Sequence, residues 1–180
     1  MMIDSPTDSK DTRTGTNEVT EYETEEYQVV IPGESFALLE FERDEKLGSA
    51  VVNIALRGFE PKIVFGWHLS LIIELEEVDD EKMPTDAERE VVDAFGKTLD
   101  LAIIGKDTEK PNAVFLGQVL WNGTLELIWR VFEPDPVNDF LQSIYKEEGD
   151  RRPRTFDFQM EHDVEWKLCQ WHLEEHPLAD

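Results

Sequence analysis

The chain has 180 residues, with 41 acidic and 17 basic side chains and a formal net charge of -24 at pH 7. A field of this sign repels phosphate backbones, which argues against nucleic acid binding and favours cationic proteins as partners. A hydrophobic content of 40% is sufficient for one domain with a sizeable core. The single cysteine, Cys169, excludes an intrachain disulfide.

The sequence contains no targeting or membrane signal. The first residues lead into a polar segment without the apolar core of a secretion signal. The most apolar run, residues 63–75, contains His68 and Ser70 and is too short to cross a bilayer. We therefore expect a cytoplasmic protein that does not contact membranes.

The first 26 residues differ from the rest in composition. They are rich in Thr, Ser, Asp and Glu, and they carry a net charge of -6, which leaves -18 for the remainder. Such a segment buries too little apolar area to offset the entropy lost on ordering. We expect residues 1–26 to form a disordered acidic arm and residues 27–180 to form a single α+β domain.

Short apolar runs separated by turn residues predict the strands that follow. Two or three N-terminal strands are expected, over residues 27–31, 36–42 and 50–57. The clearest strand is expected over residues 65–76, where every second side chain from Phe65 to Leu75 is large and apolar. One face of this strand therefore belongs to the core.

Capping residues and turn residues mark two helices and a hairpin. Thr85 and Glu88 have the spacing of a capping box, and they predict a helix that ends before Gly105. Asn122-Gly123 predicts a type I′ turn between strands over residues 113–121 and 124–132. The apolar stripe expected on the helix is Val91, Phe95, Leu99 and Ile103.

A second helix and a closing strand complete the pattern. Asp135-Pro136 supplies a cap and a first-turn proline, and Gly149 ends the helix. A strand follows in which Phe156, Phe158 and Met160 share one face, and then a short helix over residues 164 to about 173. The apolar stripe expected on the second helix is Val137, Phe140, Leu141, Ile144 and Tyr145.

The order of these elements predicts the fold class. From His68 onward it reads strand, helix, strand, strand, helix, strand, the split βαβ plan called ferredoxin-like. We expect an α+β domain with a ferredoxin-like βαββαβ antiparallel sheet, two or three additional N-terminal strands and a short C-terminal helix. The additional strands would extend the sheet or cross its open face.

The heptad at residues 160–166, Met-Glu-His-Asp-Val-Glu-Trp, concentrates groups that could bind a metal. Neighbouring side chains point in different directions, however, so they rarely converge on one ion. The structural interpretation makes Asp163 a helix cap and Trp166 an anchor against the sheet. The alternative is a metal-binding protein or metal-dependent hydrolase that uses the C-terminal His, Asp and Glu cluster, built around His162, Asp163, His172 and His176.

Other reactive groups have simple structural interpretations. His172 to His176 match a zinc peptidase pattern, but Pro177 follows at once, which does not suit the long helix of those enzymes. We expect Cys169 to be buried as a small apolar group and His68 to be a satisfied or partly exposed surface histidine. No phosphate-binding loop or dinucleotide fingerprint is present in the sequence. We expect no cofactor and no catalysis.

Two groups of residues are candidates for binding. The tryptophans serve mainly in packing, but aromatic side chains that are exposed beside carboxylates mark interfaces. The basic loop at residues 151–154 either pairs internally with carboxylates or contacts an anionic ligand. The tentative binding residues are Trp121, Glu126 and Trp129 on the hairpin, and Arg151, Arg152 and Arg154 in the loop.

Three segments in order, residues 83–99, 114–132 and 154–171, resemble the bacterial domain of unknown function 695 family. The similarity covers roughly residues 27–173, and Asp163 and Trp166 match the closing Asp-x-x-Trp motif of that family. Some members look linked to domains similar to the regulator of ribonuclease E activity B, an acidic protein that inhibits by binding. Because this chain ends soon after Trp166, we expect that second domain to be absent. The resemblance brings no catalytic residue.

Together these patterns predict a binding protein. We expect an acidic protein-binding or regulatory module that engages a basic partner through a carboxylate-rich face, with aromatic anchors in the contact. Exposed sheet edges would also permit a homodimer. The acidity has an alternative explanation, an acidic housekeeping domain in a salt-adapted organism.

Overall fold

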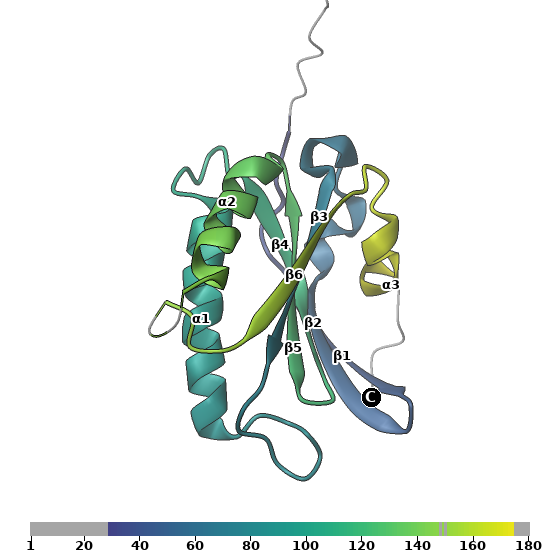
Figure 1. Cartoon of the computed structure of the whole chain (residues 1–180). Coiled ribbons are helices and arrows are strands. Elements are labelled where there is room, and N and C mark those ends of the chain that lie inside the picture. The colour runs from purple at the N-terminus through teal and green to yellow at the C-terminus, as the bar shows by residue number, and fades with distance from the viewer. Residues whose placement is uncertain (1–28, 148, 150, 175–180) are drawn as a thin grey trace, which may run out of the picture.

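The computed structural model describes residues 29–147, 149 and 151–174, so the expected acidic arm lies outside the described residues. The protein has an α+β fold with a six-stranded antiparallel sheet in the order β1-β2-β4-β5-β3-β6 (Figure 1). The strands are β1 (Phe36–Arg43), β2 (Lys46–Asn53), β3 (Trp67–Glu74), β4 (Ala113–Trp121), β5 (Thr124–Val131) and β6 (Phe156–His162). The helices are α1 (Asp86–Ile104), α2 (Pro134–Tyr145) and α3 (Gln170–Leu173), with 3-10 turns η1 (Ile54–Gly58), η2 (Lys62–Phe65) and η3 (Lys167–Cys169).

The central hairpin forms where the turn residues predict it. Asn122 and Gly123 both have positive φ, 51° and 82°, as a type I′ turn requires. The flanking strands β4 and β5 pair from Trp121 and Thr124 outward. The structure therefore confirms this prediction. The hairpin could be predicted because the turn and both strands are specified by residues adjacent in the sequence.

The N-terminal strands differ from the prediction in two places. Residues 29–31 form no strand, whereas β1 is confirmed. The strand predicted over residues 50–57 is placed too late, because β2 already begins after a tight turn at Asp44 and Glu45. After Asn53 the chain leaves the sheet in η1, which buries Leu56. The apolar alternation of residues 50–56 therefore spans two different elements.

The start of α1 is confirmed, with one correction. The Thr85 hydroxyl accepts a hydrogen bond from the Glu88 N–H at 3.2 Å. Glu88 does not return this bond to the cap, because its carboxylate is buried and bound elsewhere. Val92, not Val91, joins the buried stripe, and Gly105 with φ of 90° ends the helix as expected.

The second helix is shifted from its predicted boundaries. It starts at Pro134, one residue before the predicted cap Asp135, which lies in the first turn instead. It ends at Tyr145, before Gly149. None of the described helices is long and apolar enough to cross a membrane.

The two long helices pack on one face of the sheet, which we call the helix face. Figure 1 shows α1 and α2 on one side of the strands and α3 on the other. The core beneath α1 and α2 is built from strands β3, β4, β5 and β6. Its buried side chains include Leu69, Leu71, Ile73, Leu99, Leu127, Trp129, Leu141 and Phe156.

The opposite face, which we call the second face, is partly covered by η1, η2 and the C-terminal segment. Leu56, Phe65, Ile128 and Trp166 form a separate buried cluster there. The helix predicted from residue 164 begins only at η3, because Trp166 has a left-handed φ of 59°. Both faces of the central sheet are therefore partly buried.

Strands β2 and β1 extend the sheet beyond the long helices. Gly117 in β4 permits this junction, because a Cβ there would lie 2.4 Å from the Val51 carbonyl oxygen. On the helix face, large apolar side chains of β1 and β2 stay exposed: Phe36 by 46%, Leu38 by 60% and Leu47 by 69%. This part of the sheet has a core on its second face only.

Candidate functional site

The heptad that contains His162 and Asp163 forms part of a structural centre on the second face. The Arg130 side chain is fully buried beneath the C-terminal segment. It donates from Nη1 to the Asp163 carboxylate at 3.1 Å and from Nε to the Phe65 carbonyl at 3.3 Å. Its guanidinium lies 4.9 Å from the centroid of the Trp166 ring. We call Arg130, Asp163 and Trp166 the C-terminal clasp.

Asp163 holds the clasp to η3 as well. Its carboxylate accepts hydrogen bonds from the N–H groups of Lys167 and Leu168 at 2.9 and 3.0 Å. Burial raises the pKa of Asp163, but these two N–H groups and Arg130 outweigh that effect and hold the pKa below its ordinary value. Asp163 thus acts as a cap, although for η3 and not for a helix starting at residue 164.

Cys169 and His68 are both buried, and burial keeps both side chains uncharged at neutral pH. Burial raises the pKa of the Cys169 thiol to about 11. Burial, with a contribution from Arg130, lowers the pKa of His68 to about 4. At neutral pH the Cys169 side chain is therefore a thiol and the His68 side chain is a neutral imidazole. The expectation of a satisfied or partly exposed His68 is wrong, because the side chain is 8% exposed and its Nδ1 has no hydrogen-bond partner among the described residues.

This arrangement predicts low reactivity of Cys169. In the folded protein at pH 8, we expect alkylation by iodoacetamide to be at least about 100-fold slower than in urea, because burial excludes the reagent and disfavours the thiolate. Mass spectrometry of timed aliquots measures both rates. Equal rates in the folded and unfolded chain would contradict this account of the site.

The predicted metal ligands do not form a site among the described residues. Within residues 29–147, 149 and 151–174, no group of three His, Cys, Asp or Glu side chains could hold a metal ion. His162 is exposed and its ring lies 4.9 Å from that of Trp67, whereas the His172 ring lies 5.0 Å from that of Trp171. His176 lies outside the described residues.

Two arginines of the basic loop contact groups near the end of α2. Arg151 forms an ion pair with Glu147 at 2.7 Å. Arg152 donates to the carbonyl oxygen of Tyr145 at 2.6 Å. Both contacts are made within the chain, as the first of the two alternatives for this loop predicts.

The third arginine forms the best-buried ion pair on the helix face. Arg154 donates from Nε and Nη2 to the two carboxylate oxygens of Glu88, at 2.8 and 2.6 Å. Glu88 also accepts the Glu76 N–H at 3.1 Å. The hydrogen bond from Arg154 is the main reason that the pKa of Glu88 lies below its ordinary value, and burial opposes it. Arg154 therefore joins the loop to α1.

The three candidate residues of the hairpin point to different faces. Trp129 is fully buried on the helix face, so it is not an exposed anchor. Glu126 and Trp121 lie on the second face, where Glu126 accepts a hydrogen bond from Ser70 at 2.5 Å. Trp121 is half-buried, and the guanidinium of Arg43 lies 5.5 Å from its ring centroid. They do not form one site.

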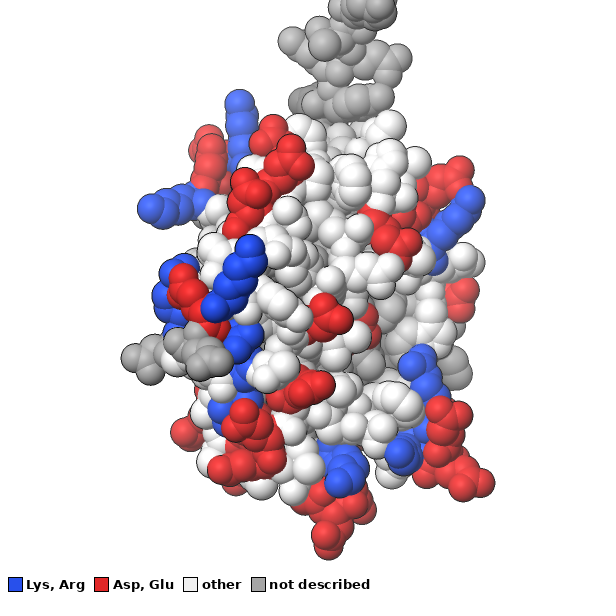
Figure 2. Space-filling model, viewed as in Figure 1, with Lys and Arg blue, Asp and Glu red and all other residues white. Residues whose placement is uncertain are grey.

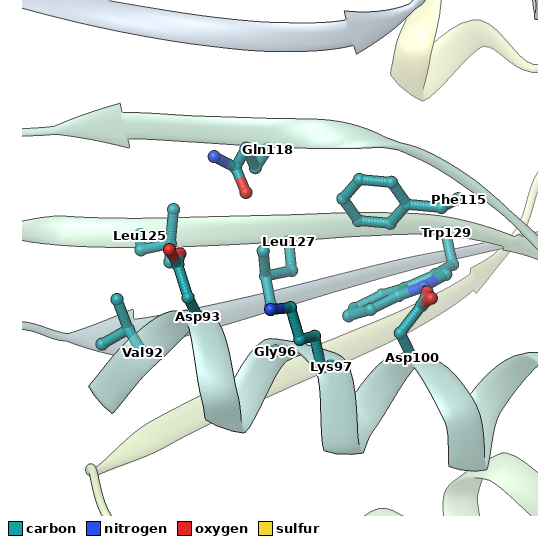
Figure 3. Close-up of a pocket in the computed structure, with 10 residues that line it drawn as sticks. All are labelled: Val92, Asp93, Gly96, Lys97, Asp100, Phe115, Gln118, Leu125, Leu127 and Trp129. Carbon is teal, nitrogen blue, oxygen red and sulfur yellow. The ribbon is translucent and has the colours of Figure 1, made fainter. Parts of the chain in front are cut away.

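A cleft of about 200 Å³ lies between α1 and the sheet (Figure 3). Its floor is apolar and includes Trp129, which packs edge-on against Phe115 with the ring centroids 5.5 Å apart. Its rim is polar. The floor consists of Phe115, Leu125, Leu127 and Trp129, and the rim of Asp93, Lys97 and Asp100 from α1 and Gln118 from β4.

The cleft continues into the uncovered part of the helix face. Phe36 on β1 approaches Phe115 at the cleft, with 6.3 Å between ring centroids. Leu38 is opposite Val51 on β2, which is opposite Gln118 at the rim. We call this surface, with Phe36, Leu38 and Leu47 as its exposed floor and α1 as its wall, the apolar shelf.

The charged side chains on the wall and among the floor residues of the apolar shelf are mainly acidic. Asp93 and Asp100 project from the wall, and Glu40 and Glu42 lie on the same face of β1 as Leu38. Lys97 is the basic residue among those that line the cleft, so these five groups carry a net charge of -3. Figure 2 shows that acidic residues are scattered over the viewed side around a mostly uncharged centre, without a single acidic patch there. The shelf therefore defines a candidate binding surface more precisely than the net charge of the whole chain does.

A larger hollow of about 1160 Å³ lies at one end of the sheet. Its apolar lining includes Val30 and Phe132, which are 76% and 52% exposed. Its charged lining residues are Glu109, Lys110 and Glu133, so it has less excess negative charge than the shelf. This end groove is the second surface on which a partner could bind.

Comparison of the chain with protein-family models, curated proteins and solved structures found no match. The resemblance to the domain of unknown function 695 family therefore stays a prediction. The matching residues Asp163 and Trp166 have a structural role here, because both belong to the C-terminal clasp.

The residues of the apolar shelf were not among the sequence-based candidates. Phe36 and Leu38 alternate with Ala37 and Leu39, so the pattern shows apolar side chains on both faces of β1. This continuous apolar character is the available signal, because a strand with one solvated face would carry polar residues at alternate positions. Sequence alone does not show which face has no cover.

Proposed function

We propose that this chain is a non-catalytic protein-binding module whose apolar shelf receives an amphipathic, basic helix of a partner protein. The observation that carries this proposal is the pair of neighbouring exposed apolar side chains Phe36 and Leu38, beside an acidic helix wall, with Leu47 further along the same face beyond Glu40 and Ser49. Exposed apolar groups that adjoin one another mark interaction surfaces, whereas isolated ones do not.

A helix is the occupant that suits the shape of the shelf. α1 and α2 already form a helical layer on this face of the sheet, and β1 and β2 continue the sheet without continuing that layer. A further helix beside α1 would bury the shelf floor through residues spaced i, i+3, i+4 and i+7. This geometry reproduces the ordinary packing of helices on a sheet.

The charge of the shelf favours a basic helix. With a net charge of -3 from five lining and bordering groups, the shelf attracts Lys and Arg side chains at the margins of an apolar stripe. The formal charge of -24 on the whole chain adds long-range steering toward cationic partners and weakens with salt. A module that binds a helix of a partner protein in this way fits a regulatory role.

The state of the reactive groups supports a non-catalytic role. The Cys169 thiol and the His68 imidazole are buried and neutral, and Arg130 is bound within the C-terminal clasp. Their contacts explain their burial without a substrate.

A homodimer through β6 is a less favoured form of binding. The Thr155 carbonyl accepts the Glu74 N–H, and the Asp163 N–H donates to the Gly66 carbonyl. The odd-numbered residues of β6 therefore bond to β3, and the backbone N–H of Phe158 points outward from the edge of the sheet. That N–H already donates to the carboxylate of Asp157 at 2.9 Å. Because this outward N–H is already bonded within the chain, the edge of β6 is a poorer template for pairing with a second copy.

The ferredoxin-like assignment of the central elements is part of this proposal. It is supported by the spatial order β4-β5-β3-β6 and by the placement of α1 and α2 on one face.

Localisation in the cytoplasm also remains our proposal. The salt-adapted housekeeping alternative predicts that the protein unfolds in low salt, and our proposal predicts that it stays folded.

Isothermal titration calorimetry tests the binding proposal with a synthetic helix. The probe is a peptide of Leu and Lys with Leu at helical i, i+3, i+4 and i+7 spacing, and a scrambled peptide of the same composition is its control. We expect Leu38→Asp to weaken binding at least about tenfold by placing a charge on the shelf floor. Ile63→Asp, a change of another exposed residue away from the shelf, should leave the affinity unchanged.

Two results would overturn the proposal. One is binding of the scrambled peptide with the affinity of the helical peptide, which would indicate unspecific charge attraction. The other is equal affinity of the wild type, the Leu38→Asp variant and the Ile63→Asp variant. Circular dichroism of each variant shows whether it is folded before the titration.

A further inference from the structure

The carboxylate of Asp100 is fixed in position at the mouth of the cleft. One of its oxygens, Oδ1, accepts a hydrogen bond from the indole N–H of Trp129 at 2.8 Å. Trp129 is fully buried in the centre of the sheet, so its ring cannot move with the surface. Figure 3 shows the Asp100 carboxylate beside the nitrogen of this indole. The second oxygen, Oδ2, has no hydrogen bond or ion pair among the described residues.

No positively charged side chain among the described residues pairs with this carboxylate. Burial raises the pKa of Asp100, and the Trp129 hydrogen bond opposes that rise only partly. Lys97 lies one turn earlier on α1, yet no ion pair within 4.0 Å joins it to Asp100 or Asp93 in the described structure. The desolvation cost of Asp100 is therefore not offset by a positive charge of the protein.

The size and lining of the cleft restrict what could supply the charge. About 200 Å³ is smaller than the roughly 300–1,000 Å³ typical of sites for drug-sized ligands, and it suits a group the size of one side chain. The apolar floor formed by Phe115, Leu125 and Leu127 suits an alkyl stem. The partly exposed ring of Phe115 adds attraction for a cation.

We propose that the cleft binds an alkylammonium or alkylguanidinium group, with Asp100 as its counter-ion, and that this group is a Lys or Arg side chain of the helix docked on the shelf. This inference rests on the proposed function and names the anchor within it. The stem lies on the apolar floor, and the charged end meets the free oxygen of Asp100. Lys97 lines the same cleft without pairing with Asp100, and its positive charge repels a bound cation and so weakens the site.

The test uses a small probe so that it does not depend on the helix. The full chain is titrated with n-pentylammonium, and n-pentanol is the neutral control of the same length. The readout is the NMR signal of the Trp129 indole N–H, which is identified by its shift in the Asp100→Asn variant. Asparagine keeps an oxygen that can accept the Trp129 hydrogen bond, so this variant removes the charge with little change in shape.

We expect n-pentylammonium to shift the Trp129 signal saturably and n-pentanol to bind at least about tenfold more weakly. Asp100→Asn should weaken n-pentylammonium about tenfold and leave n-pentanol unchanged, while Lys97→Met should tighten n-pentylammonium binding. Equal affinity of the two probes, no saturable shift, or an unchanged affinity in Asp100→Asn would overturn the inference.

The two proposals fail separately. If n-pentylammonium binds as expected and the helical peptide does not, the cation site stands and the docking of a helix on the shelf falls. If the peptide binds and Asp100→Asn leaves its affinity unchanged, the docking stands and Asp100 is not its anchor.

Discussion

Replacing Arg130 with Met should lower the free energy of unfolding by about 3–5 kcal/mol, because it leaves the Asp163 carboxylate partly buried without its cation. The side chain of Arg130 is fully buried and that of Asp163 is 9% exposed, so water cannot replace the lost partner. The same change removes the cation over the Trp166 ring. Urea unfolding at pH 7, followed by tryptophan fluorescence, measures the loss.

The pH dependence of the C-terminal clasp has a defined sign. Because the folded-state pKa of Asp163 is depressed, its contribution to stability is present above the pKa of the unfolded chain and is lost as the pH falls through the folded-state value. The difference in stability between the wild type and Asp163→Ala should therefore be full at pH 7 and shrink below about pH 4. A loss under about 1 kcal/mol for Arg130→Met, or a difference that grows in acid, would contradict this role of the clasp.

Replacing Glu88 with Ala should lower the free energy of unfolding by about 2–4 kcal/mol. The change removes both hydrogen bonds from Arg154 and leaves the Glu76 N–H without its acceptor. Glu88 is fully buried, so the cavity and the unpaired groups add to the loss. Thermal or urea unfolding of the variant measures it.

The control for this prediction is Glu90→Ala on the same helix. Glu90 is exposed and has no ion pair among the described residues, so its removal should change stability by no more than about 0.5 kcal/mol. Similar losses in the two variants would show that Glu88 acts through helix propensity or overall charge and not through Arg154.

The elements that could be predicted from the sequence depend on neighbouring residues. The turn at Asn122-Gly123 and the cap at Thr85 act over two to four positions, so their signals are complete within the local sequence. The alternation predicted over residues 65–76 likewise specifies both faces of β3 from Trp67 to Ile73. It is wrong at Phe65, which lies in η2 and packs in the core of the second face. The α+β class follows from these local signals alone.

The features that could not be predicted depend on contacts between distant residues. Glu88 has the spacing of a capping box, but its carboxylate is taken by Arg154, 66 positions away. The left-handed Trp166 is held by bonds to the carbonyls of Lys62 and Phe65, about a hundred positions earlier. No local propensity contains this information, so the boundary of the C-terminal helix was misplaced.

The candidate site was missed for a related reason. Whether Leu38 lies in a core or on an open shelf depends on how far the helical layer extends over the sheet, and the lengths of α1 and α2 alone do not fix this. Trp129, by contrast, is a tentative binding residue of the sequence and lies fully buried at the base of the cleft. Residue type identified a relevant side chain, but only the fold shows its role.

If the apolar shelf, and not another surface, receives the helix, the helical peptide of Leu and Lys must perturb the residues of the shelf. Backbone amide chemical-shift mapping of the full chain with this peptide measures where it binds. We predict that the largest shifts cluster on β1 and β2 around Leu38 and Leu47 and on α1 between Asp93 and Asp100. Shifts concentrated in the end groove around Phe132, or along the outer edge of β6, would contradict the claim.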